Sequence, residues 1–331
     1  MALGEVIAAG EAERFREFAA QIEAIQRARA SASLGLTRGL HVKQHVGAVG
    51  ELVVTAAESE RVGVFAESGH RWPVYARFSN GSGHKQSDNA PDARGFALKL
   101  VGVPGKKLIE GLEDAVTQDF LFINTAALPF RTPDEFMAFH RAAQDGALRL
   151  LPRLIGAVGF GRALEIFKAA LSTPKVKSFA THAFHTGAPL MLGDRAAKLG
   201  LFPSAGVPAP TATGDDHLRE DLVARLHAGP LTWHLRAQRF VDEATTPIED
   251  ASVDWPGPWF DLATLTLPTQ DVRSPRGKEI CELVHQLSFD PWHASEAHRP
   301  LGAIMRARRV TYAASVIGRK ALPEPRSVLS L

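Results

Sequence analysis

Tyr312, one of only two tyrosines in the chain, lies among arginines in the segment ARRVTYAASVIGR, residues 307–319. If this segment is helical, Arg308, Tyr312 and Arg319 fall at positions i, i+4 and i+11 and share one face with Ser315. A cation close to a phenol favours its ionised form, and a phenolate is a ligand for ferric iron. Alone, however, the pattern would equally suit a helix with a solvated basic face.

Two histidines form a second candidate site, because His41 and His45 stand four residues apart in RGLHVKQHVGAVGEL, residues 38–52. On a helix this spacing could bind zinc. The valines and glycines that follow favour a strand instead, so zinc is the weaker interpretation. Considered by itself, His41 is an ordinary hydrogen-bonded histidine.

The segment VYARFS, residues 74–79, carries polar side chains on a predicted strand. Alternation places Tyr75, Arg77 and Ser79 on one face and Ala76 and Phe78 on the other. An arginine and a serine on the same face could bind an anion and orient a third group. Alternatively, both face solvent on a half-exposed strand.

The elements that position these residues follow from hydrophobic periodicity and turn residues. Helices are predicted over 5–30, where Phe15, Phe18, Ile22 and Ile25 form an apolar stripe, and over five later segments. Short strands separated by Gly, Asn, Asp and Pro favour an antiparallel barrel or sandwich over a parallel sheet. We therefore expect a β-barrel with helices packed outside it. The later helices are 133–144, 160–171, 216–228, 275–288 and 302–319, and the strands are 46–56, 61–66, 73–79, 94–101, 118–124, 231–241 and 259–267.

Composition bounds what the chain can bind and where it can reside. The 38 basic and 36 acidic residues nearly cancel, so nucleic acid is not an expected partner. The lone Cys281 excludes an intramolecular disulfide and any multi-cysteine metal site. No stretch approaches about 18 consecutive apolar residues, and the acidic N-terminal helix differs from a secretory signal. We expect no membrane span, a cytoplasmic location, and one domain over 35–331 with a helix in 1–34 packed on it. Assembly into a homo-oligomer is left open.

Five motifs occur in the same order as in the haem catalases. They are RGLHVKQH (38–45), YARFSNGSG (75–83), PDARGFALKL (91–100), QDFLFINT (118–125) and the Arg-Tyr-Arg segment. Over roughly residues 35–320 the chain resembles this superfamily, and most closely its short members, the catalase-related peroxidases. The resemblance implies an α+β fold built on a catalase-like antiparallel barrel of about eight strands with surrounding helices. It also implies ferric haem b as the cofactor.

The same resemblance assigns roles to individual residues. His41 matches the distal histidine, Ser79 the serine that orients it, and Asn124 the distal asparagine, which gives three catalytic residues. Tyr312 matches the axial ligand of the haem iron, with Arg308 close to its oxygen. The predicted cofactor-binding residues are Arg38, Arg77, Phe130, Arg308, Tyr312 and Arg319. By contrast, Arg306 and Arg309 are expected to face solvent, and in PDARGFALKL Asp92 and Arg94 could simply pair.

The implied activity is reduction of hydrogen peroxide or organic hydroperoxides with an organic electron donor, with some catalase activity. Val310 and Ala314 depart from the family pattern, and the long C-terminal extension of full-size catalases is missing, so we expect an open pocket that favours bulky peroxides. A competing hypothesis is a hydroperoxide isomerase or dehydratase similar to the allene oxide synthases. Those relatives carry threonine where Leu40 precedes His41. A non-enzymatic haem carrier or peroxide sensor, and a barrel without haem, are also compatible with the sequence.

Overall fold

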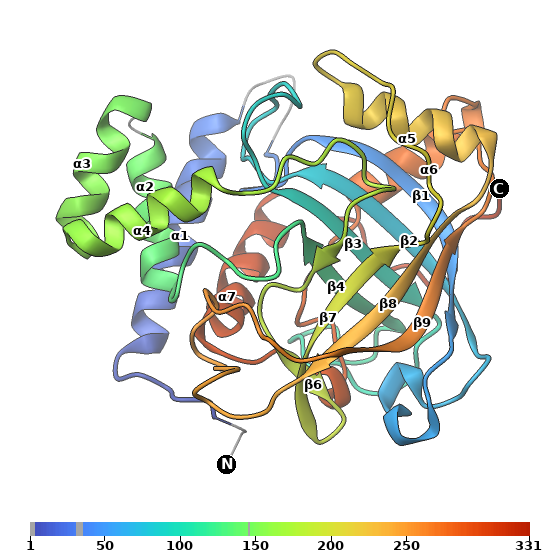
Figure 1. Ribbon diagram of the computed structural model, residues 1–331, viewed down its shortest axis with the longest axis horizontal. Helices are drawn as coiled ribbons and strands as arrows, with labels where there is room; N and C mark the ends of the chain where they lie inside the picture. Colours follow the sequence, from blue (N-terminus) through green and yellow to red (C-terminus); the bar gives the residue numbers. More distant parts are fainter. Residues whose placement is uncertain (1–3, 31–35, 145) are drawn as a thin grey trace.

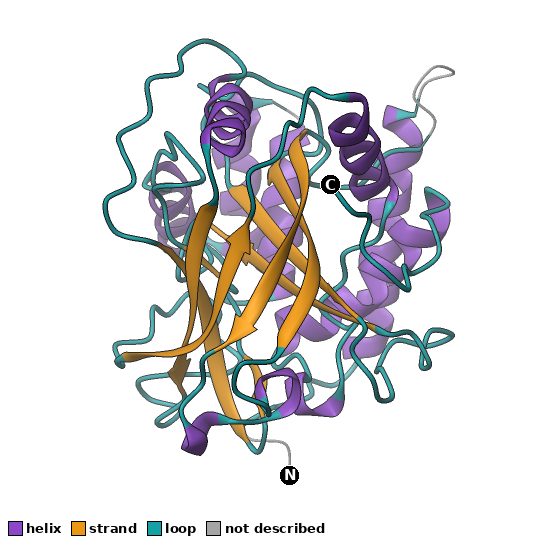
Figure 2. Ribbon diagram, turned by 90° about the vertical axis from the view of Figure 1, so that its right-hand side faces the viewer, coloured by secondary structure: helices purple, strands orange, loops and turns teal. Residues whose placement is uncertain are grey.

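A closed antiparallel barrel forms the centre of the protein. The computed structural model describes residues 4–30, 36–144 and 146–331, and within them nine strands form one sheet of order β5-β4-β3-β2-β1-β9-β8-β7-β6. Because β5 also pairs with β7, eight strands close on themselves and β6 pairs only with β7 (Figure 2). The strands are β1 (Gln44–Val54), β2 (Arg71–Asn80), β3 (Arg94–Val101), β4 (Thr117–Ile123), β5 (Phe184–His185), β6 (Leu190–Leu192), β7 (Arg195–Pro203), β8 (Leu231–Arg239) and β9 (Trp259–Leu267).

The barrel interior is filled by alternate apolar side chains of these strands. Phe78, Phe96 and Trp233 meet there, with ring centroids 4.2 Å apart for the first two and 5.2 Å for the last two. The alternation predicted for β2 is confirmed: Ala76 and Phe78 point into this core. The opposite face of β2, with Arg77 and Ser79, lies outside the barrel, where a second layer of structure covers it.

Helices form that second layer. The chain has α1 (Glu11–Arg29), α2 (Pro133–Gln144), α3 (Ala147–Val158), α4 (Phe160–Leu171), α5 (His217–Ala228), α6 (Pro275–Gln286) and α7 (Ala303–Gly318), with short 3₁₀ turns at Glu58–Glu60, Gly63–Phe65 and Glu296–His298. In Figure 1, α1 runs beside α7, while α2, α3 and α4 form a group at the left of the barrel. Phe15 and Phe18 of α1 pack with Met137 of α2 and Ala307 of α7. No helix in the described ranges is both long and apolar enough to span a bilayer.

Most predicted elements are confirmed, and the exceptions have local causes. Strands 94–101 and 259–267 and helix 133–144 match their predicted bounds, and Thr132 Oγ1 caps that helix by accepting from Glu135 N at 3.3 Å. The prediction of a strand at 61–66 is wrong, because Gly63–Phe65 forms a 3₁₀ turn with Gly63 at φ 52°. Val64 N donates to His298 Nε2 instead of to a neighbouring strand. The predicted boundary between residues 34 and 35 lies outside the described residues.

Four elements were missed by the sequence patterns. Strand β7 is rich in Ala, Gly and Lys, which have low strand propensity, and β5 and β6 are only two and three residues long. Helix α3 contains Pro152 and Gly156, both unfavourable inside helices. Each of these elements is therefore stabilised by packing on its neighbours rather than by its own sequence.

The expectation that Arg306 faces solvent is wrong. Its guanidinium lies between α7, α1 and two loops, and it donates to Glu11 Oε1 at 2.7 Å, to Glu249 Oε1 at 2.9 Å and to Glu5 Oε1 at 3.0 Å. The Arg306 contact lowers the pKa of Glu11. Because one cation joins three carboxylates from distant segments, it fixes α1 on α7. Arg309 is exposed as expected and lies over the Trp292 ring.

Replacing Arg306 by methionine should loosen α1, because three partly buried carboxylates would lose their shared cation. We expect a loss of about 2 kcal/mol in the free energy of unfolding, measured by urea titration, together with faster proteolysis within α1. Arg309→Met on the same helix is the matched control and should change stability by less than about 0.5 kcal/mol. Equal effects of the two substitutions would contradict the anchoring function of Arg306.

Candidate functional site

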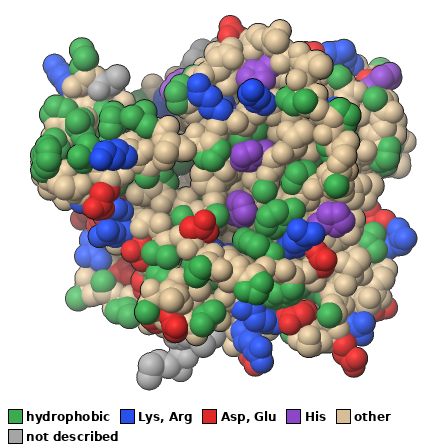
Figure 3. Space-filling view, in the orientation of Figure 1, with side chains coloured by type: hydrophobic (Ala, Val, Ile, Leu, Met, Phe, Trp, Pro, Cys, Tyr) green, Lys and Arg blue, Asp and Glu red, His purple; other side chains and the backbone are tan. Residues whose placement is uncertain are grey.

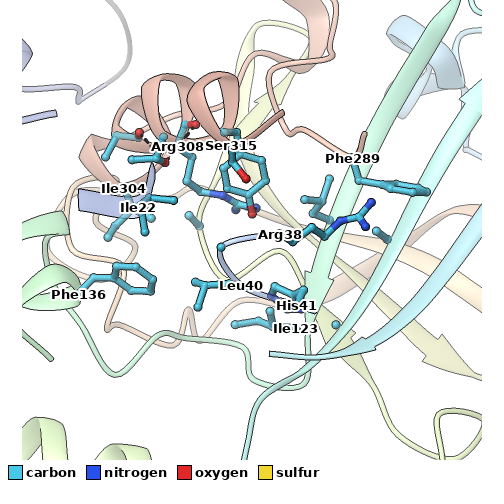
Figure 4. A pocket seen from close by; sticks show the side chains of 18 of the residues that line it. Ile22, Arg38, Leu40, His41, Ile123, Phe136, Phe289, Ile304, Arg308 and Ser315 are labelled. Atoms are coloured by element: carbon cyan, nitrogen blue, oxygen red, sulfur yellow. Dashed lines mark hydrogen bonds between the residues drawn. The ribbon is translucent and has the colours of Figure 1, made fainter. Parts of the chain in front are cut away.

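A cavity of about 240 Å³ lies between the outer face of the barrel and α7. Strands β2, β3 and β4 form one wall, α7 forms the facing wall, and α1 and α2 contribute apolar side chains. Figure 4 shows Arg308 and Ser315 on the α7 side, His41 on the other side and Arg38 towards one end. Ile22, Phe136 and Ile304 lie towards the opposite end. The cavity therefore has mainly apolar walls that carry polar groups facing each other, His41 on one side and Arg308 and Ser315 on the other, with a basic end and an apolar end.

His41 has an unusual backbone conformation at this site. Its φ is 57°, in the left-handed region that non-glycine residues rarely adopt, and such strain gathers at functional sites. The conformation is held from several sides: His41 N donates to Gly81 O at 2.9 Å, and Arg77 Nη2 donates to His41 O at 2.7 Å. The ring Nδ1 lies 3.1 Å from Ser79 Oγ. His41 lines the cavity, where the second ring nitrogen, Nε2, is the one that could face a ligand.

Gly95 of β3 lets the His41 ring approach the barrel. A Cβ at this position would lie 2.7 Å from His41 Nδ1 and 2.9 Å from Ser79 Oγ, which are both closer than real Cβ contacts. Only glycine therefore leaves room for the histidine–serine pair. A glycine inside a strand often marks such a close approach, so Gly95 in the segment PDARGFALKL is itself a sequence signal for this contact.

The imidazole of His41 is held in its neutral form. Burial, followed by the positive charges of Arg77, Arg308 and Arg38, lowers the pKa of His41 to about 3. In a neutral imidazole, one ring nitrogen carries a proton and the other is free to accept one. If Nδ1 carries the proton and donates it to Ser79, then Nε2 is the nitrogen that can accept a proton. The group is thus arranged to act as a base throughout the neutral pH range.

Tyr312 faces the cavity from α7, as the helical periodicity predicted. Arg308 Nη2 donates to Tyr312 Oη at 2.8 Å, and its guanidinium carbon lies 4.8 Å from the centre of the tyrosine ring. Ser315 and Arg319 line the same cavity one and two turns further along α7. The predicted shared face of the helix is therefore confirmed, and the phenol oxygen has a cation as its partner.

Arg38, Arg77 and Arg319 gather around the basic end of the cavity. Arg38 donates to His285 O and Leu287 O, and Arg319 donates to Gln286 O and Leu287 O, at 2.5 to 3.0 Å. These carbonyls belong to the last turn and the end of α6, where the helix dipole is negative.

The three guanidiniums remain electrostatically unbalanced. Burial lowers the pKa of Arg77 to about 9, with Arg319 adding to the effect, and burial lowers that of Arg319 to about 10. Burial and the charges of Arg77 and Arg319 also lower the pKa of Arg38. Within the described residues, none of the three forms an ion pair with a carboxylate. The basic end is therefore suited to an anionic ligand, which would supply the missing negative charge.

Two predicted site residues are not part of the cavity wall. Asn124 is buried beside it, but its amide accepts from Arg94 N at 2.7 Å and donates to Pro174 O at 3.0 Å. Phe130 packs behind the wall, in an apolar cluster with Phe139 and with Phe136, which does line the cavity. The pairing of Asp92 with Arg94 is present, at 3.3 Å.

The zinc interpretation has no support from the two histidines. His45 Nε2 bonds to Asn80 Oδ1 at 2.7 Å, whereas His41 bonds to Ser79, so their partners differ. In the described part of the chain, no group of three His, Cys, Asp or Glu residues is arranged to hold a metal ion.

Two lining residues of α1 and one residue behind the wall were not predicted as site residues. Phe18 and Ile22 of α1 line the cavity, although α1 lies outside the region of resemblance. Gln44 Oε1 accepts from Arg77 Nε at 3.1 Å and so helps to aim that guanidinium. The apolar stripe of α1 was visible in the sequence, but nothing local indicated which surface it would cover.

The chain has the fold of catalases. No protein-family model and no curated protein sequence matches it. A fungal catalase superposes with a TM-score of 0.68 at 19% identity, over 90% of this chain and 62% of that one. Catalase A from Saccharomyces cerevisiae superposes with a TM-score of 0.68 at 18% identity, over 91% of this chain and 64% of that one. A bacterial catalase superposes with a TM-score of 0.64 at 19% identity, over 92% of this chain and 60% of that one. The chain therefore spans about three fifths of the length of these catalases, and at this identity the likeness establishes the fold.

Gly95→Ala should break the His41–Ser79 contact, because the added methyl group would overlap both side chains. We expect a crystal structure of the variant to show the imidazole displaced, and unfolding measurements to show a loss of roughly 1 to 3 kcal/mol. Gly156→Ala is the control: it lies inside α3 with nothing within 4 Å of the new Cβ, and it should gain up to about 1 kcal/mol. An unmoved His41 ring would contradict this packing argument.

Proposed function

We propose that the protein is a haem-dependent peroxidase that reduces hydrogen peroxide or organic hydroperoxides, with haem b between His41 and Tyr312. The observation that carries this proposal is the pairing of two unlike walls: a strained, neutral histidine on one side and an arginine-paired tyrosine on the other. The catalase fold of the chain supports it. Bound haem would supply the iron at which the peroxide O–O bond is broken.

The residues around the cavity fit this cofactor. Haem is a flat apolar macrocycle with two carboxylates, and the cavity combines apolar walls with an end where Arg38, Arg77 and Arg319 have no carboxylate partners among the described residues. Tyr312 would provide an oxygen ligand to ferric iron, which is an established form of haem ligation. Arg308 would hold and orient that oxygen through its 2.8 Å hydrogen bond.

The chain's own chemistry is a proton transfer on the His41 side. Neutral Nε2 would accept the proton of the peroxide oxygen that approaches the cofactor and return it to the departing oxygen, so that water or an alcohol leaves. Ser79 would keep the ring in place, since its hydroxyl holds Nδ1. We do not assign a catalytic contact to Asn124, because its amide is already bonded to the backbone of Arg94 and Pro174.

The apolar end of the cavity favours organic peroxides. Phe18, Ile22 and Phe136 would contact an alkyl or aryl group, whereas hydrogen peroxide would gain nothing from them. Leu40 also lines the cavity beside His41 and offers no hydroxyl to restrain it, which supports a peroxidase over a hydroperoxide isomerase. Incubating the haem-loaded protein with a lipid hydroperoxide, with and without a phenolic donor, separates the two: an epoxide formed without donor oxidation would overturn the peroxidase.

The absorption spectrum of the purified protein tests the cofactor. We expect a Soret band, which Tyr312→Phe should shift or abolish because the oxygen ligand is removed. Tyr75→Phe is the matched control, since the only other tyrosine bonds to the C-terminal segment at Ser327 and Leu329 and should leave the spectrum unchanged. Unchanged haem content and spectrum in Tyr312→Phe would remove Tyr312 as the ligand.

His41→Ala should retain haem but react with peroxide about 10² to 10⁴ times more slowly, because the proton transfer is lost. Stopped-flow absorption would measure this rate, and the exposed His84→Ala is the control. A rate within a factor of two of the unmodified protein would show that His41 is not the base.

The pH profile tests the electrostatics of His41. Because its pKa is lowered to about 3, the neutral ring persists as the pH falls from 7 to 5, and the rate should not decline through His41 protonation. A histidine with the ordinary pKa near 6.5 would lose about 25-fold in its neutral fraction over the same range. A loss of that size in the unmodified protein, absent from His41→Ala, would contradict the lowered pKa.

A further inference from the structure

Helices α3 and α4 expose apolar side chains on the outside of the molecule. Leu148 is 95% exposed, Phe160 69% and Leu171 65%, and Phe160 is the only exposed phenylalanine, tyrosine or tryptophan among the described residues. Phe160 stands at the turn between the helices, between Gly159 and Gly161. We call these side chains, with the basic residues Arg149, Lys168, Lys175 and Lys177, the α3–α4 surface.

The segment that forms this surface, residues 147–177, has a net positive charge, unlike the rest of the chain. Residues 147–177 contain six basic residues and one acid, Glu165, for a net charge of +5, whereas the full chain has 38 and 36. The rest of the chain therefore has 32 basic and 35 acidic residues, a net charge of −3. Glu165 is already paired with Arg162 at 2.8 Å. Within the described residues, Arg149, Lys168, Lys175 and Lys177 form no ion pair and are exposed.

The inner faces of α3 and α4 already pack against the protein. The exposed apolar side chains are therefore not needed for the hydrophobic core. Leu154, Ala163 and Ile166 are buried against α2 in one apolar cluster. Figure 3 shows hydrophobic side chains gathered at the left of the molecule, where Figure 1 places α3 and α4, with basic side chains beside them. Helix α2, under this group, contributes Phe136 and Met137 to the cavity wall.

We propose that the α3–α4 surface binds to an anionic lipid bilayer. Phe160 would enter the boundary between headgroups and acyl chains, and the lysines would contact lipid phosphates, as basic amphipathic helices do at membrane surfaces. A second copy of the chain that docked through the same surface is a poorer occupant, because it would place two sets of these four basic side chains against each other. The proposal does not depend on haem or on peroxidase activity. With that activity, it would place the apolar end of the cavity near hydroperoxides of membrane lipids.

Vesicle co-sedimentation of the purified chain tests the proposal. The probes are vesicles of phosphatidylcholine alone and vesicles of phosphatidylcholine and phosphatidylglycerol in equal parts. We expect binding to the mixed vesicles only, and release as salt is raised, because exposed charges are screened. Absence of binding to the mixed vesicles, or equal binding to both kinds, would overturn the proposal.

Two sets of matched variants test the surface itself. Lys168→Glu, Lys175→Glu and Lys177→Glu combined should weaken binding on the order of 100-fold, since each basic residue near an anionic membrane contributes about fivefold. The control combines Lys85→Glu, Lys106→Glu and Lys278→Glu, which are exposed elsewhere and change the net charge equally. Equal losses in the two sets would show a general charge effect and overturn the assignment to this surface.

Insertion of the Phe160 side chain into the bilayer can be measured separately, by quenching of tryptophan fluorescence. Phe160→Trp should be quenched by lipids with brominated acyl chains, while Val241→Trp, at a similarly exposed site (66%), should not. Phe160→Asp should abolish binding and leave thermal unfolding and the Soret region unchanged. Tight binding of the chain to poly-glutamate with none to mixed vesicles would identify an acidic polypeptide as the partner and overturn the lipid proposal.

Discussion

The end of α6 is the structural feature on which the candidate site depends. Its last carbonyls, with that of Leu287, accept hydrogen bonds from Arg38, in the loop before His41, and from Arg319, at the end of α7. The negative end of one helix dipole therefore joins the histidine wall of the cavity to the tyrosine wall. Several cations therefore lie at one end of the cavity with no ion-paired carboxylate among the described residues, so that an anionic ligand would balance their charge.

Burial first, and neighbouring cations second, explain why the histidine stays neutral. Arg77 bonds to the His41 carbonyl and, with Arg308 and Arg38, disfavours a positive imidazole. Ser79 and Gly95 fix the ring from the barrel side, one by a hydrogen bond and the other by having no side chain. Position and protonation state are thus set by the same small group of residues. The strained backbone at His41 is tolerated because several independent contacts hold it.

Much of this arrangement could be predicted, and the failures share a cause. The shared face of α7 and the alternation in β2 depend only on local geometry, and both are confirmed. The solvent exposure of Arg306 was predicted wrongly, because its partners Glu5, Glu11 and Glu249 come from distant segments. Asn124 and Phe130 stay predictions: both lie next to the lining residues, Asn124 bonded to the backbone of Arg94 and Pro174, and Phe130 packed on Phe136.

By itself, the sequence determined which residues share a face: Arg308 with Tyr312 and Arg319, and Arg77 with Ser79. Helical and strand periodicities are properties of the backbone, so these sets do not depend on the rest of the fold. Only the tertiary structure decided that the two faces meet across one cavity and that α1 contributes to its lining. It also decided that Arg306 binds carboxylates of other segments, while Arg38 lines the site. Those outcomes depend on packing between segments far apart in the chain, where charge balance and side-chain volume, rather than local pattern, select the partners.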